Sequence, residues 1–111
     1  MNTRIVNILG EEYTINTDVS TSEDDSLERM AGYCDYSVKS IVVAKLEKLQ
    51  DSLKDLKVYE NKIIRHEVIH AFLKESGLAE NTDWATNEEM VDYFAIQFPK
   101  MLKVFKELGV V

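Results

Sequence analysis

The first half of the chain carries short β-rich runs separated by polar or glycine-containing stretches. Residues 4–9 (RIVNIL) and 12–16 (EYTIN) flank Gly10, an arrangement typical of a β-hairpin. A polar stretch at 17–26 has the composition of a solvated loop, and residues 37–45 (SVKSIVVAK) then have the β-branched density of a further strand. The N-terminal half therefore predicts a small antiparallel sheet.

From residue 46 onward the spacing of apolar positions becomes helical. The first such spacing is carried by four leucines, Leu46, Leu49, Leu53 and Leu56. Residues 58–76 then show a broad apolar surface, which predicts a central and largely buried helix. Gly77 follows it and is placed to end the helix in a left-handed cap.

A second helix is predicted at 86–98 (TNEEMVDYFAIQF). Thr86 is a natural N-cap, and Glu89 stands three residues later at capping-box spacing. Pro99 should end or kink this helix, and residues 101–109 continue as an amphipathic helix with a lysine row on its solvated side. The pattern as a whole predicts one α+β domain over 1–111: a small antiparallel sheet packed on the helix at 58–76, with the second helix crossing beside it.

The composition excludes several classes of protein and agrees with the predicted α+β fold. The 111 residues are 45% hydrophobic and 30% charged, as in a soluble globular domain. A formal net charge of -7 argues against a nucleic-acid partner, because phosphates would be repelled. No window approaches eighteen apolar residues, so no membrane span is expected. Cys34 is alone, which excludes an internal disulfide and suits a reducing compartment, so a cytoplasmic location is expected.

Both histidines of the chain lie four positions apart within the helix predicted at 58–76. Residues with this spacing share one helix face, so His66 and His70 can present two imidazole nitrogens to a single metal ion. Glu67 stands beside them, which completes the H-E-x-x-H arrangement of two zinc ligands and a general base that activates water. The competing interpretation is a pair of helix histidines satisfied by ordinary hydrogen bonds. The coincidence of spacing, Glu67 and a second acidic helix favours metal binding.

A catalytic zinc site usually needs a third protein ligand beside the open position. The longer pattern with a third histidine is absent, because Leu73 and Ser76 occupy the positions of its glycine and histidine. The third ligand must then be a carboxylate or Cys34. Glu88 and Asp92 lie four apart on one face of the second predicted helix.

We expect Glu88 to complete the zinc ligands, and we assign the neighbouring Glu89 to the helix cap. Asp92, one turn along, can accept the second ring N–H of a ligating histidine and so orient it; a plain surface position is its alternative. Peptide deformylases take a ligand from an upstream cysteine, but the GYCDY stretch lacks their glycine-cysteine-leucine context. Cys34 is therefore expected to be a small buried thiol.

HEVIH, followed after a loop by NEEMVD, resembles the gluzincin metallopeptidases. In that group a glutamate on a second helix is the third zinc ligand, and an aspartate four residues later supports a histidine. The resemblance covers 65–92, and the short chain is similar to the minimal single-domain gluzincins and to small zinc peptidases of phage and prophage genomes. It implies Zn²⁺ as cofactor, a peptide or protein substrate, and residues 37–45 as the edge strand beside the cleft.

The chain departs from the larger gluzincins downstream of the motif. They carry a further histidine or tyrosine that stabilises the oxyanion, and here no histidine follows Glu88. Tyr36, Tyr59 and Tyr93 are candidates, but their spacing selects none of them. The leading interpretation is a zinc-dependent peptidase. The alternative is a zinc-stabilised binding or regulatory protein without turnover, and the sequence specifies neither a substrate nor an oligomeric state.

Overall fold

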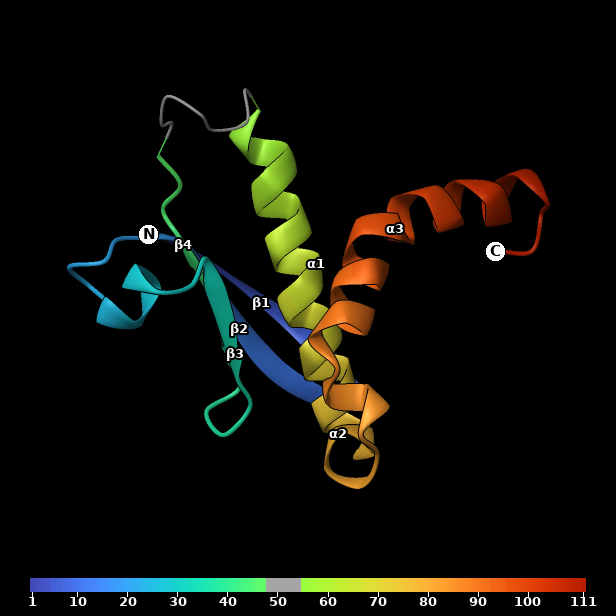
Figure 1. Ribbon diagram of the computed structural model, residues 1–111, viewed down its shortest axis with the longest axis horizontal. Coiled ribbons are helices and arrows are strands. Elements are labelled where there is room, and N and C mark those ends of the chain that lie inside the picture. The colour runs from blue at the N-terminus through green and yellow to red at the C-terminus, as the bar shows by residue number, and fades with distance from the viewer. Residues whose placement is uncertain (48–54) are drawn as a thin grey trace.

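The computed structural model describes residues 1–47 and 55–111 as an α+β fold with a four-stranded mixed sheet (Figure 1). The strands pair in the order β1-β2-β4-β3. The elements in chain order are β1 (Asn2–Ile8), β2 (Glu11–Val19), the 3-10 turn η1 (Asp25–Glu28), β3 (Gly32–Asp35), β4 (Ser40–Ala44), α1 (Leu56–Glu75), α2 (Leu78–Asn81), the 3-10 turn η2 (Trp84–Thr86) and α3 (Glu88–Glu107).

The predicted hairpin is confirmed, and it is longer than the sequence pattern indicated. β1 and β2 pair antiparallel, with Ile8 opposite Glu11. The two residues between them, Leu9 and Gly10, have φ angles of 50° and 93°, as a two-residue hairpin turn with right-handed twist requires. β2 continues to Val19, so the first residues of the loop predicted at 17–26 belong to the strand.

The prediction of a purely antiparallel sheet is wrong, because β2 and β4 run parallel. β4 also lies between β2 and β3, so residues 37–45 do not supply the edge strand. Its residues Ile41 to Ala44 are all buried, the pattern of a strand covered on both faces rather than one exposed at an edge. The edge strand next to α1 is β3, within the GYCDY stretch that the sequence pattern did not identify as a strand.

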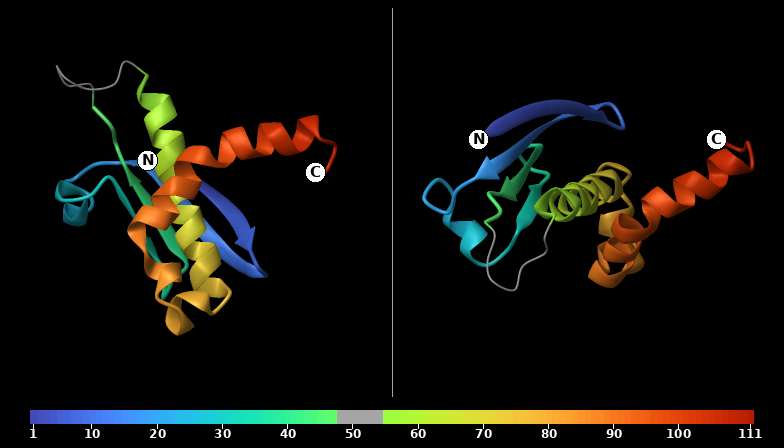
Figure 2. Two further views of the ribbon diagram at one scale, coloured as in Figure 1. Left: turned by 45° about the vertical axis from the view of Figure 1, so that its right-hand side comes forward. Right: turned by 90° about the horizontal axis from the view of Figure 1, so that it is seen from above.

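The core lies between α1 and one face of the sheet (Figure 2). From α1, Ile63 and Ala71 enter a cluster whose sheet members are Ile8, Tyr13, Ile15, Ile41 and Val43. Gly32 of β3 lies so close to the helix that a Cβ there would be 2.9 Å from Cγ2 of Ile63. A second, smaller cluster joins Leu27 of η1 to Val19, Val42 and Ala44 of the sheet.

The helix predicted at 58–76 corresponds to α1, and Gly77 after it has the left-handed φ of 82° that was expected. The prediction that this helix is largely buried is wrong, because within α1 only Ile63, Glu67 and Ala71 are buried. Of the four leucines with helical spacing, Leu56 is the first residue of α1, and Leu46 lies in the irregular segment after β4. Leu49 and Leu53 lie outside the described residues. No helix within the described residues has both the length and the apolar character needed to cross a membrane.

The N-cap of α3 is Asn87 and not Thr86 as predicted. The Asn87 side chain accepts a hydrogen bond from the Met90 N–H at 2.8 Å, whereas the Thr86 hydroxyl donates backwards to the Asp83 carbonyl. An amide oxygen at position 87 caps the first turn directly, so Glu89 has no capping-box role. α3 is one helix through Pro99, so Pro99 does not end it, but the helix bends along its length and its second half projects away from the sheet (Figure 1).

Candidate metal centre

His66 and His70 lie on one face of α1, and their rings converge. Their Nε2 atoms are 3.2 Å apart, and the ring centroids are 4.9 Å apart in an edge-to-face arrangement. Their side chains are mostly buried, with exposed fractions of 16% and 20%. The i, i+4 spacing on a regular helix is sufficient to produce this convergence without any distortion of the backbone.

Glu88, the first residue of α3, reaches both rings with its carboxylate. Its Oε2 lies 3.0 Å from Nε2 of His66, and its Oε1 lies 2.9 Å from Nε2 of His70. One ligand atom from each of the three residues lies within 4.8 Å of the others. Zinc bonds of about 2.0–2.1 Å at tetrahedral angles place neighbouring ligand atoms roughly 3.3 Å apart, so this set fits a zinc ion with only small adjustments.

Asp92 holds the other side of the His66 ring. His66 Nδ1 and Asp92 Oδ1 are 3.1 Å apart, and the same oxygen accepts from Lys62 Nζ at 2.7 Å. The hydrogen bond from Lys62, with a smaller contribution from His66, lowers the pKa of Asp92, so the carboxylate is ionised. A carboxylate at Nδ1 favours the tautomer with its proton there, which leaves the Nε2 lone pair free to bind a metal.

His70 is favoured in the form that binds metal. Burial lowers the pKa of His70, although the nearby Glu88 carboxylate acts in the opposite direction. A histidine must be neutral to donate its lone pair to a metal ion, so burial supports ligation at neutral pH.

Glu67 is buried on the wall of the same cleft, with an exposed fraction of 8%. Burial raises the pKa of Glu67; the charge of His66 opposes this rise, and that of Glu88 adds to it. Among residues 1–47 and 55–111 its carboxylate has no hydrogen-bond partner, and it lines the cleft together with the two histidines. A carboxylate with a raised pKa and free oxygens suits a general base.

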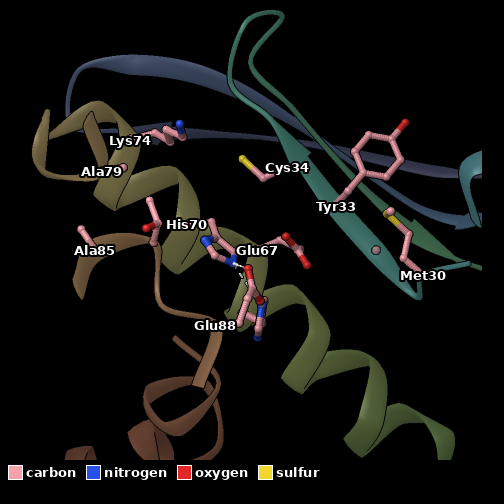
Figure 3. Close-up of a pocket in the computed structure, with 12 residues that line it drawn as sticks. Met30, Tyr33, Cys34, Glu67, His70, Lys74, Ala79, Ala85 and Glu88 are labelled. Atoms are coloured by element: carbon pink, nitrogen blue, oxygen red, sulfur yellow. Dashed lines mark hydrogen bonds and ion pairs between the residues drawn. The ribbon is translucent and has the colours of Figure 1, made fainter. Parts of the chain in front are cut away.

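The cleft has a volume of about 470 Å³ and opens between α1, β3 and the segment from α2 to Glu88 (Figure 3). A second hollow of about 500 Å³ continues past Tyr33 and Cys34 along β3 to Tyr36. Lys74, one turn beyond His70, lines both, and its Nζ lies 4.5 Å from the centre of the Tyr36 ring. An extended groove thus runs along the edge strand.

Cys34 lies on the cleft wall and is half-buried rather than enclosed in the core. Burial, and next the charge of Glu67, raise the pKa of its thiol to about 11. It is not part of the converging group formed by His66, His70 and Glu88. The structure therefore separates Cys34 from the three candidate ligands.

The three tyrosines considered for the oxyanion take different positions. Tyr93 is exposed and packs edge-to-face on Phe94, outside the cleft. Tyr59 lines a smaller hollow of about 150 Å³ beside His66 and Glu67, and Tyr36 lies at the far end of the groove. None of the three donates a hydrogen bond to the candidate ligands within the described part of the chain.

The sequence pattern missed several residues that build the site. Lys62 stands four positions before His66, so its contact with Asp92 follows from the same helix face that carries the histidines. Gly32 and Tyr33 form the cleft wall because β3 packs against α1. Alternation of small and large residues in GYCDY was the one available signal for this strand.

Comparisons with protein-family models, with curated proteins and with solved structures find no match to this chain.

Proposed function

We propose that this protein is a zinc-dependent peptidase in which His66, His70 and Glu88 hold the ion. The observation that carries the proposal is the convergence of two imidazole nitrogens and one carboxylate, 2.9–3.2 Å apart, at the mouth of a cleft. A set of two imidazoles and one carboxylate suits zinc, and three protein ligands leave one coordination position open.

Zinc, when bound, supplies a Lewis acid that polarises a peptide carbonyl and makes water more acidic. Glu67 accepts the proton of the attacking water and passes it to the leaving amine, which requires a carboxylate within reach of the cleft. Asp92 keeps His66 in the ligating tautomer, and Lys62 holds Asp92 in place. These roles follow the gluzincin pattern that HEVIH and NEEMVD resemble.

The substrate in this proposal is an extended peptide. Among the described residues β3 pairs with β4 alone, and its other edge borders the groove that leads away from the metal ligands. A free strand edge can form backbone hydrogen bonds with an added peptide strand. We also propose a cytoplasmic location and kinship with the small zinc peptidases of phage and prophage genomes, on the motif alone.

A second function, zinc-stabilised binding without turnover, has one observation in its favour. In the described part of the chain none of the three tyrosines considered as oxyanion donors lines the main cleft: Tyr93 is exposed, Tyr36 lies at the far end of the groove, and Tyr59 lines a separate, smaller hollow. A protein of this kind would still bind a peptide along β3, but Glu67 would not be needed for its activity.

Glu67→Gln separates the two functions, because an amide cannot accept the proton of water. A quenched-fluorescence peptide library, with zinc measured in the same samples, should show hydrolysis by the wild type and none by the variant at equal zinc content. Glu89→Gln, an exposed neighbour of the ligand Glu88, is the matched control and should hydrolyse normally. Equal peptide binding and no hydrolysis by either protein would favour the binding function.

A further inference from the structure

Pro99 removes one backbone hydrogen bond from the interior of α3. The helix runs without interruption from Glu88 to Glu107, with Pro99 inside it. In an α-helix each carbonyl accepts from the N–H four residues later, so the carbonyl of Ala95 should be paired with residue 99. Because proline has no N–H, the helix itself leaves this carbonyl without a donor.

Arg65 of α1 supplies the missing donor. Its Nε donates to the carbonyl oxygen of Ala95 at 2.7 Å. Ala95 has no exposed surface, so its carbonyl would be costly to leave unpaired there. A guanidinium donor also gives a stronger bond than a neutral one. The bond that Pro99 deletes within one helix is thus replaced by a bond between two helices.

This interhelix bond lies on the face of α3 that carries the candidate metal site. Ala95 follows Asp92 by one turn and Glu88 by two turns, and Val91 between them is fully buried. On α1, Arg65 directly precedes His66. The two helices are therefore fixed to each other close to the point where the carboxylates of α3 reach the imidazoles of α1.

We propose that Arg65 is a positioning residue of the metal centre: by pairing the buried carbonyl that Pro99 leaves without a donor, it lets α1 and α3 pack at the spacing at which Glu88 and Asp92 reach the histidines. This inference rests on the proposed metal site. Pro99 makes the interhelix bond necessary, because with any other residue at 99 the Ala95 carbonyl can be paired inside α3. The role of Arg65 on α1 therefore depends on Pro99 on α3.

The test is a double-mutant cycle on zinc affinity, measured by competition with a chromogenic chelator. Arg65→Met removes the donor and keeps most of the aliphatic length, and we expect it to weaken zinc binding by about tenfold. Pro99→Ala restores a backbone N–H for Ala95 and should bind zinc within about threefold of the wild type. In the Pro99→Ala background, Arg65→Met should then cost less than about threefold, because the restored N–H at position 99 pairs the carbonyl.

Lys57→Met is the matched control, since it removes a cation from the exposed first turn of α1 and should leave zinc affinity unchanged. Equal losses from Arg65→Met in both backgrounds, or no loss of affinity in either, would overturn the proposal while the zinc site stands. A wild-type chain that binds no zinc would overturn the proposed function as well. If Arg65→Met alone does not fold, a folded, zinc-binding double variant supports the proposal and an unfolded one overturns it.

Discussion

Gly32 is the position where the packing of the cleft wall can be tested most sharply. An added Cβ would lie 2.9 Å from Cγ2 of Ile63 and 2.9 Å from the Val42 carbonyl oxygen. Carbon atoms in packed interiors are separated by about 3.5–4.0 Å, so β3 and α1 would have to move apart by roughly half an ångström or more. The Val42 contact is with backbone, which side-chain rotation cannot relieve.

Overpacking of this kind typically costs about 1–3 kcal/mol, so we expect Gly32→Ala to lower the free energy of unfolding by about 2 kcal/mol. For a chain of this size that corresponds to a fall in Tm of about 8 °C. The same Cβ would lie 3.7 Å from Cγ of Glu67, so displacement of α1 should also reduce peptide hydrolysis.

Urea unfolding at neutral pH, with hydrolysis measured in parallel, provides the assay. Ile63→Ala removes one of the two clashing groups, so Gly32→Ala should cost less in that background, with the Val42 contact still limiting the recovery. Gly10→Ala is a contrasting variant, because its space is open and only its φ of 93° is strained. It should destabilise the hairpin and leave the rate of hydrolysis at full zinc occupancy unchanged. A Gly32→Ala protein as stable as the wild type would refute the close approach of β3 to α1.

Three further predictions concern the groups around the site. Asp92→Asn should weaken zinc binding by about 10–100-fold in a chelator competition, because His66 loses its ionised partner; an unchanged affinity would contradict the orienting role. Glu75→Gln should destabilise the fold mainly above pH 4.5, because hydrogen bonds from Lys39 and Tyr13 lower the Glu75 pKa and so stabilise the folded state when Glu75 is ionised. This stabilisation is lost as the pH falls through the lowered pKa. Urea midpoints at neutral and acidic pH should therefore show the difference between wild type and variant shrinking at acidic pH. Cys34→Ser should retain zinc. In the wild type, Cys34 should react with a thiol reagent at about pH 8 far more slowly than free cysteine does, because the pKa of its thiol is raised to about 11.

The hairpin and the long helix could be predicted because their signals are local. Gly10 between two β-rich runs defines the turn, and the apolar periodicity of 58–76 defines α1. The sheet order could not be predicted in the same way, because which strand lies beside β2 depends on long-range packing. The continuous burial of Ile41 to Ala44 marks a central strand, but a short apolar run gives no direction for its partners.

In the candidate site, too, the features with local sequence signals could be predicted and those that depend on long-range packing could not. The four residues of the candidate site could be predicted from the sequence, because i, i+4 spacing places His66 with His70, and Glu88 with Asp92, on one helix face before any tertiary structure is known. The contacts that join the two helices, such as Lys62 to Asp92 and Arg65 to Ala95, depend on how α1 and α3 cross. Thr86 was misassigned as the cap because the neighbouring Asn87 is an equally good cap by composition, and only the helix start decides between them.

Zinc X-ray absorption on the purified chain, with metal content measured on the same samples, tests the central claim most directly. We predict one zinc per chain, bound by two imidazoles and a carboxylate oxygen, with zinc lost in Glu88→Ala and kept in the adjacent Glu89→Ala. Zinc retained unchanged in Glu88→Ala, or no zinc bound by the wild type, would contradict an ion held jointly by α1 and α3.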